Sequence, residues 1–188
     1  YTLSLHDALP ICSALIQNFT VDKHEPNSGY DIDFLIGASD ETRKIMSDTA
    51  NRLNESGAKT IVCYDGYDAK IFLREYKEYG IVLNADIVTF PAFVSELISG
   101  GKLRVKKSDR EYTFQDPPAI ARDLEDADSA RKILDECGTV REMLLCKDAT
   151  MLAGNLLMNE YIPDVMQLVA KNRLENAKNV NAEVIVTA

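Results

Sequence analysis

Four cysteines are the residues of this 188-residue chain best suited to redox or metal chemistry: Cys12, Cys63, Cys137 and Cys146. Thiolates are soft ligands that suit zinc and iron–sulfur clusters. The cysteines are too sparse for a disulfide framework in a chain of this length, and no Cys-x-x-Cys pair occurs. The small number of cysteines, without a disulfide framework, indicates a reducing compartment, and we expect a cytoplasmic protein.

The reactive side chains also have plain structural interpretations. Cys63 ends a run of β-branched residues, where a lone cysteine is more often a small buried hydrophobe than a ligand. Cys146 beside Lys147 could be an acidified thiol, but no histidine stands near it in sequence, so we do not expect nucleophilic catalysis. Asp65 and Asp68 could be oxygen ligands, although carboxylates beside a turn more often belong to a loop and a helix start.

The composition excludes two broad classes of function. A net charge of −9 argues against a nucleic-acid surface, and the basic cluster at residues 104–110 is expected to be a solvated turn. No run of about 18 apolar residues exists, so no membrane span is expected. No G-x-G-x-x-G or Walker motif appears. The 46% hydrophobic content is sufficient for a packed core.

Helical and strand patterns alternate along the chain. Helices are expected at residues 39–57, 68–79, 93–98 and 127–135 and from Pro163 onward. Strands are expected at residues 60–64, 87–90 and 182–187, and a pair of short strands at 103–107 and 111–114. Such alternation predicts an α/β fold with mainly parallel sheets.

A short sequence pattern occurs twice in the chain. An Asn-Arg-Leu helix segment at residues 51–53 precedes an Ala-x-x-Ile-Val strand at 58–62, and similar segments recur at 172–174 and 182–186. This repeat predicts that one helix-to-strand unit was duplicated. The alternative is a chance similarity between two amphipathic helix-to-strand units. Because Ile61-Val62 and Ile185-Val186 are apolar on both faces, both pairs are predicted to lie in central strands.

Two motifs carry a family resemblance. The sequence QDPP at residues 115–118, with Arg122, Arg131 and Leu134 after it, and the strand GAKTIV at 57–62 together resemble the cysteine-rich CCG domains of heterodisulfide-reductase-like iron–sulfur proteins. The resemblance covers about residues 25–188. It implies two related units of mainly parallel sheet flanked by helices, at residues 12–105 and 106–188.

The family resemblance also implies a function. Its members bind [4Fe-4S] clusters through cysteines and transfer electrons between a flavin or ferredoxin-type partner and a disulfide, quinone or 2-hydroxy-acid oxidase subunit. Here Ser28, Gly66, Pro118 and Leu152 stand where the family has cysteines, and Cys63 alone matches a family ligand. The resemblance therefore implies a degenerate member, with Cys63 as a residual cluster ligand.

Two functions follow as alternatives. The first is an iron–sulfur electron-transfer subunit, at most part of an oxidoreductase of heterodisulfide reductase or 2-hydroxy-acid oxidase type. In this case the cluster is incomplete in this chain or supplied by a neighbouring domain. The second is a cluster-free scaffold or interaction domain that packs against a redox partner subunit.

Both ends of the chain carry unusual features. Residues 1–11 resemble the translation of a sequencing adapter, so we expect them to be an artefact outside the fold. The chain stops within a strand pattern, and a second family Cys-x-x-Cys would begin just after Ala188. We therefore expect a fragment whose second unit is truncated.

Overall fold

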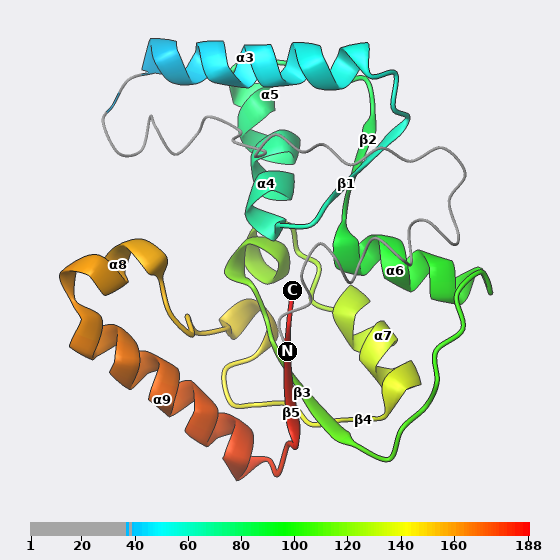
Figure 1. The fold of residues 1–188 in the computed structure, drawn as a ribbon, viewed down its shortest axis with the longest axis vertical. Coiled ribbons are helices and arrows are strands. Elements are labelled where there is room, and N and C mark those ends of the chain that lie inside the picture. Colours follow the sequence, from blue (N-terminus) through cyan, green and yellow to red (C-terminus); the bar gives the residue numbers. More distant parts are fainter. Residues whose placement is uncertain (1–36, 38) are drawn as a thin grey trace. The chain divides into compact units, whose positions relative to one another are not determined.

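The computed structural model describes residue 37 and residues 39–188, which form helices and two small parallel sheets (Figure 1). The predicted α/β class is confirmed. The chain divides into two compact units, residues 1–90 and 91–188. The interpretations of residues 1–11, Cys12 and Ser28 lie outside the described residues. Whether the two units are related, as CCG-like units at 12–105 and 106–188 would be, stays a prediction.

The first unit begins, in its described part, with helix α3 (Ser39–Glu55). Acidic residues in its first turn suit the positive end of the helix dipole. Gly57, with a φ of 66°, follows the helix in the left-handed conformation that glycine adopts most readily. The helix leads into β1 (Thr60–Cys63), which pairs in parallel with β2 (Asp86–Thr89), so that Cys63 lies opposite Thr89.

A continuous helical crossover joins the two parallel strands. It consists of α4 (Gly66–Lys70), a π-helical turn η1 (Ile71–Glu75) and α5 (Tyr76–Glu78). The crossover buries four core side chains: Ala69, Ile71, Phe72 and Tyr76. Gly80, with a φ of 70°, follows it, in agreement with the predicted stop.

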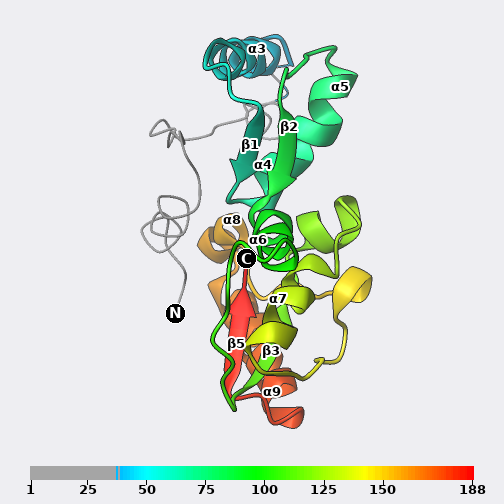
Figure 2. The same cartoon turned by 90° about the vertical axis from the view of Figure 1, so that its right-hand side faces the viewer.

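The second unit is built on a three-stranded parallel sheet of order β4-β3-β5. Strand β3 (Glu111–Gln115) lies between β4 (Thr139–Val140) and β5 (Val184–Thr187), and Figure 2 shows β3 and β5 side by side. Gln115 lies opposite Thr187, so the carboxyl ends of these two strands coincide. The residues that follow β3 therefore lie where parallel sheets commonly place functional groups.

Helices and short helical turns precede and follow the strands of this sheet along the chain. In chain order they are α6 (Phe90–Ser99), η2 (Ala119–Asp123), α7 (Ser129–Cys137), η3 (Lys147–Ala149), α8 (Leu156–Tyr161) and α9 (Pro163–Asn179). Helix α9 begins with proline as predicted, because the fixed φ of proline suits the first turn of a helix. Within the described residues no helix is both long and apolar enough to cross a membrane.

Two predictions about strands are wrong. Residues 103–107 form no strand, because Leu103 N closes the end of α6 by donating to Leu97 O, and β3 pairs instead with parallel strands from later in the chain. Within residues 39–188, β5 pairs only with β3, so Ile185-Val186 occupies an edge of the sheet rather than its centre. In the same part of the chain β1 pairs only with β2, so Ile61-Val62 does not lie in a central strand either.

Candidate functional site

Cys63 is a buried thiol at the carboxyl end of β1, only 6% exposed. Burial, reinforced by the nearby charges of Asp68 and Asp65, raises its pKa to about 12. The Asp65 carboxylate accepts a hydrogen bond from Tyr67 N at 2.7 Å and caps α4. Cluster ligation and nucleophilic attack both require a thiolate, which this environment disfavours.

The other described cysteines lie in the second unit. Cys137 ends α7 and Cys146 precedes η3, and both are partly buried. Burial and the charge of Glu136 raise the pKa of Cys137, while burial and Glu142 raise that of Cys146. The pKa of Cys146 is thus raised, so the alternative that Lys147 makes this thiol more acidic is not supported.

Among the described residues, the remaining family ligand positions provide no side-chain metal donor. Gly66 is buried in the first turn of α4, Pro118 precedes η2, and Leu152 is exposed to solvent. Throughout residues 39–188, no three His, Cys, Asp or Glu side chains group closely enough to hold a metal ion. A [4Fe-4S] cluster normally needs about four converging thiolates, so the described residues do not fit one.

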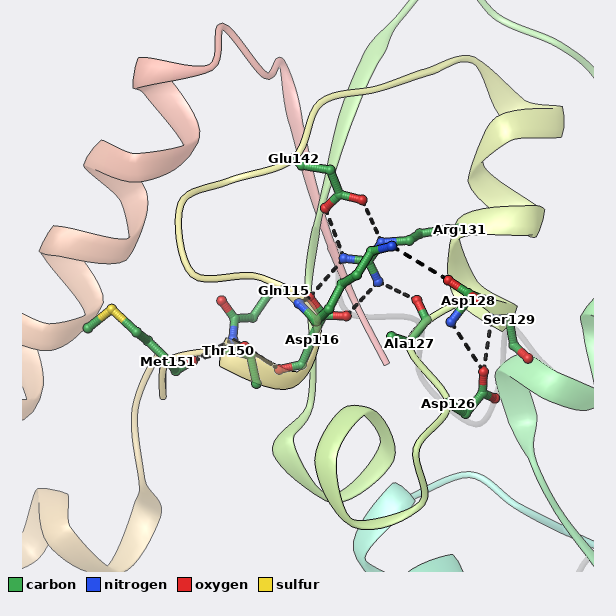
Figure 3. A network of polar contacts seen from close by, with 11 residues as sticks. Gln115, Asp116, Asp126, Ala127, Asp128, Ser129, Arg131, Glu142, Thr150 and Met151 are labelled. Carbon is green, nitrogen blue, oxygen red and sulfur yellow. Dashed lines mark hydrogen bonds and ion pairs between the residues drawn. The ribbon is translucent and has the colours of Figure 1, made fainter.

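A set of polar side chains converges where β3 ends. We call it the β3 network, and it consists of Gln115, Asp116, Arg131, Glu142, Thr150 and Arg173. All but Glu142 are buried. Figure 3 shows Arg131 between the carboxylates of Asp116 and Glu142. The sequence motif pointed to Asp116 and Arg131, but it did not indicate that they form an ion pair.

Arg131 is the centre of this network. Its Nη1 and Nη2 donate to Asp116 Oδ1 and Oδ2 at 2.6 and 3.0 Å, and its Nε and Nη2 donate to Glu142 at 2.5 and 2.9 Å. Burial by itself would lower the pKa of Arg131, but hydrogen bonds to the two carboxylates raise it. Arg131 in turn lowers the pKa of Glu142. Arg131 and Glu142 are thus held in their charged forms, which suits structural support rather than proton transfer.

The β3 network and Arg122 together fix the backbone of residues 144–152, which we call the 144–152 segment. Asp116 Oδ2 accepts from Lys147 N at 2.8 Å, and Arg173 Nη1 donates to Leu144 O at 2.6 Å. Arg122 Nη2 donates to Thr150 O at 2.5 Å. Two more hydrogen bonds, from Gln115 Nε2 to Met151 O and from Thr150 Oγ1 to Asp116 O, complete the support at 2.9 and 3.0 Å.

The backbone of this segment is held in an unusual conformation. Leu145 and Lys147 have φ values of 54° and 57°, in the left-handed region that residues with a Cβ rarely occupy. Each such residue costs on the order of 1 kcal/mol, so the surrounding hydrogen bonds must offset the strain. Strained backbone that is firmly supported occurs often at binding sites.

The supported segment presents apolar side chains to solvent. Leu144 is 71% exposed, Leu145 43% and Leu152 50%, whereas the neighbouring Met143 and Thr150 are buried. Solvent-facing apolar side chains that gather on one short segment are typical of interaction surfaces. No sequence signal singled out Glu142, Thr150 or Arg173, although Arg173 lies in the repeated Asn-Arg-Leu segment. Gln115 belongs to the QDPP motif, but the motif did not indicate its contacts.

Comparisons with known proteins assign no family: no protein-family model, no curated protein and no solved structure matches the chain.

Proposed function

We propose that this chain is a cluster-free interaction domain that packs against a redox partner subunit through the 144–152 segment. One observation carries the proposal. Leu144, Leu145 and Leu152 are exposed on a backbone that is hydrogen-bonded to the buried side chains of Asp116 and Arg173. The resemblance to CCG domains supplies the class of partner, a flavin-containing or ferredoxin-type subunit.

A supported segment is well suited to docking. Ordering a mobile loop on binding costs free energy, and a loop that is already fixed avoids most of this cost. Each leucine that a partner removes from water contributes up to about 2 kcal/mol. Asp116 accepts a hydrogen bond from the backbone of the segment, and Arg122 and Arg173 donate to it. These contacts hold the backbone in place while the side chains of Leu144, Leu145 and Leu152 stay exposed.

The electron-transfer alternative has less support in the described residues. Cys63 is the one described cysteine at a family ligand position, and its raised pKa opposes ligation. This alternative therefore needs a cluster held by another domain. Even then, the 144–152 segment would serve as a contact surface for that domain.

The test is a binding measurement on a purified complex. The tagged chain is expected to co-purify from its native cells with a protein that shows flavin or iron–sulfur absorption, which mass spectrometry then identifies. With that protein purified, the double variant Leu144→Glu/Leu152→Glu should bind at least about tenfold more weakly, because two charges would have to be buried.

A matched control separates docking from folding. Val82→Glu introduces one glutamate, against two in the double variant, at an exposed apolar position of the first unit and should leave the affinity unchanged. Thermal unfolding should show that both variants are folded. Equal binding by the double variant and the wild-type chain, or a partner without a redox cofactor, would refute the proposal.

A further inference from the structure

Helix α9 has an apolar side that the rest of the second unit does not cover. Its packed side carries the buried Arg173 and Ala177. Leu168 is nine residues before Ala177 and so lies half a turn away from it, and it is 57% exposed. Val165, one turn earlier, and Ile162 at the N-terminal boundary are also exposed. Figure 1 shows α9 (orange) along one margin of the second unit.

The apolar side of α9 is flanked by opposite charges. Asp164 lies four residues before Leu168 and Lys171 three residues after it, and both are exposed. Further along the helix, Glu175 is paired with Lys178 at 2.7 Å. Along the exposed side, one acidic residue thus precedes Leu168 and one basic residue follows it.

This arrangement is complementary to itself. If two α9 helices lie antiparallel with the Leu168 side chains at the crossing point, Asp164 of each helix faces Lys171 of the other. The Asp164–Lys171 contact therefore occurs twice, once at each end of the helix pair, as a two-fold axis requires. Antiparallel packing also places the positive end of each helix dipole beside the negative end of the other.

We propose that two copies of this chain associate through antiparallel α9 helices, with Leu168 and Val165 at the centre and Asp164–Lys171 pairs at the ends. The surface is one helix wide, so the contact belongs to the small, weak class of interfaces. The dimer should therefore dissociate in the micromolar range or above, and salt should weaken it because the flanking charges are exposed.

Sedimentation velocity tests this pairing at protein concentrations from about 10 µM to about 1 mM. This range brackets the dissociation constant expected of a weak dimer. The full chain should shift from monomer to dimer as its concentration rises. Leu168→Glu should abolish the shift. Leu174→Glu, at an exposed apolar position on another side of α9, should retain it.

Charge reversal distinguishes antiparallel α9 pairing from nonspecific apolar association. Asp164→Lys alone and Lys171→Glu alone should each weaken the dimer about tenfold, because each places like charges together at both ends. An equimolar mixture of these two variants should dimerise again, since the lysine introduced in one copy then faces the glutamate introduced in the other. The doubly exchanged chain should also dimerise. Circular dichroism should confirm that each variant is helical.

Three outcomes would overturn the proposal. They are a wild-type chain that stays monomeric over the whole range, a Leu174→Glu variant as defective as Leu168→Glu, and a mixture of the charge variants that fails to dimerise. The redox-partner proposal is tested separately, because Leu144→Glu/Leu152→Glu should leave self-association intact.

Discussion

Arg131 and Asp116, fifteen residues apart in the chain, form a bidentate ion pair with Nη1–Oδ1 and Nη2–Oδ2 distances of 2.6 and 3.0 Å. The Asp116 side chain is almost fully buried, and its Oδ2 also accepts from Lys147 N. One carboxylate therefore joins the end of β3, helix α7 and the 144–152 segment. Loss of either partner should affect all three.

Arg131→Met should destabilise the second unit by about 3–5 kcal/mol, because it leaves the Asp116 carboxylate buried without its cation. Urea unfolding followed by circular dichroism measures this change. Arg141→Met is the matched control, since Arg141 pairs with Glu111 at an exposed position. The control should lose far less stability. Equal losses in the two variants would show that the buried pair has no special role.

Glu142 should make stability depend on pH in the acid range. Its hydrogen bonds to Arg131 hold its folded pKa below the ordinary value of 4.5. The contribution of Glu142 is therefore complete above about pH 4.5 and is lost as the pH falls through the folded pKa. The free energy of unfolding of wild type minus that of Glu142→Gln should be largest near neutral pH and shrink on acidification.

Urea titrations at several pH values measure that difference. Glu160→Gln removes the same charge from an exposed position on α8 and corrects for the altered net charge. A difference between wild type and Glu142→Gln that stays constant from pH 7 to about pH 3 would contradict the assigned role of the Arg131–Glu142 pair.

The local elements could be predicted from sequence because their signals are local. Acidic residues after Ser39 and a glycine at position 57 bracket α3, and Pro163 marks the start of α9. The β-branched run before Cys63 forms β1 as expected. Each signal acts through a neighbouring backbone group or the helix dipole, so no knowledge of distant residues is needed.

Strand pairing and the β3 network depend on residues far apart in the chain. Glu111 lies opposite Thr139, and Tyr112 lies opposite Val184, so the expected neighbour at 103–107 was displaced by later strands. The family motif identified Asp116 and Arg131 as notable. Their contacts with Thr150 and Glu142 depend on how the chain returns to the end of β3, and no local pattern encodes that path.

Gly138→Ala should destabilise the junction of α7 and β4. A Cβ at Gly138 would lie 2.6 Å from Arg110 O and 2.7 Å from the Tyr112 ring. The φ of 176° is extended and suits any residue, so the effect would be steric. We expect a loss of about 1–3 kcal/mol in urea unfolding. Gly154→Ala is the control, because nothing lies within 4 Å of its Cβ, and a similar loss there would contradict the steric argument.

Cys63 should resist alkylation in the folded chain. With a pKa of about 12, its thiolate is about a thousandfold rarer at pH 8 than that of a cysteine at 9.0. Timed iodoacetamide labelling with peptide mass spectrometry should show Cys63 reacting at least about a hundredfold more slowly in buffer than in urea. The partly exposed Cys146 provides the internal comparison. Equal rates at Cys63 in the two solvents would indicate an accessible thiol.

Anaerobic reconstitution with iron and sulfide should leave the chain without a stable [4Fe-4S] cluster. A cluster of this type normally needs about four thiolates, and the described residues offer one buried cysteine at a family ligand position. At the other described family positions, the side chains of Gly66, Pro118 and Leu152 contribute no donor atom. Iron and acid-labile sulfide content, with the visible absorption spectrum, measure the outcome, and Cys63→Ser is the matched control.

We expect wild type and Cys63→Ser to retain the same low background of iron after desalting. About four irons per chain in the wild type, lost in Cys63→Ser, would restore the electron-transfer function and overturn the cluster-free proposal.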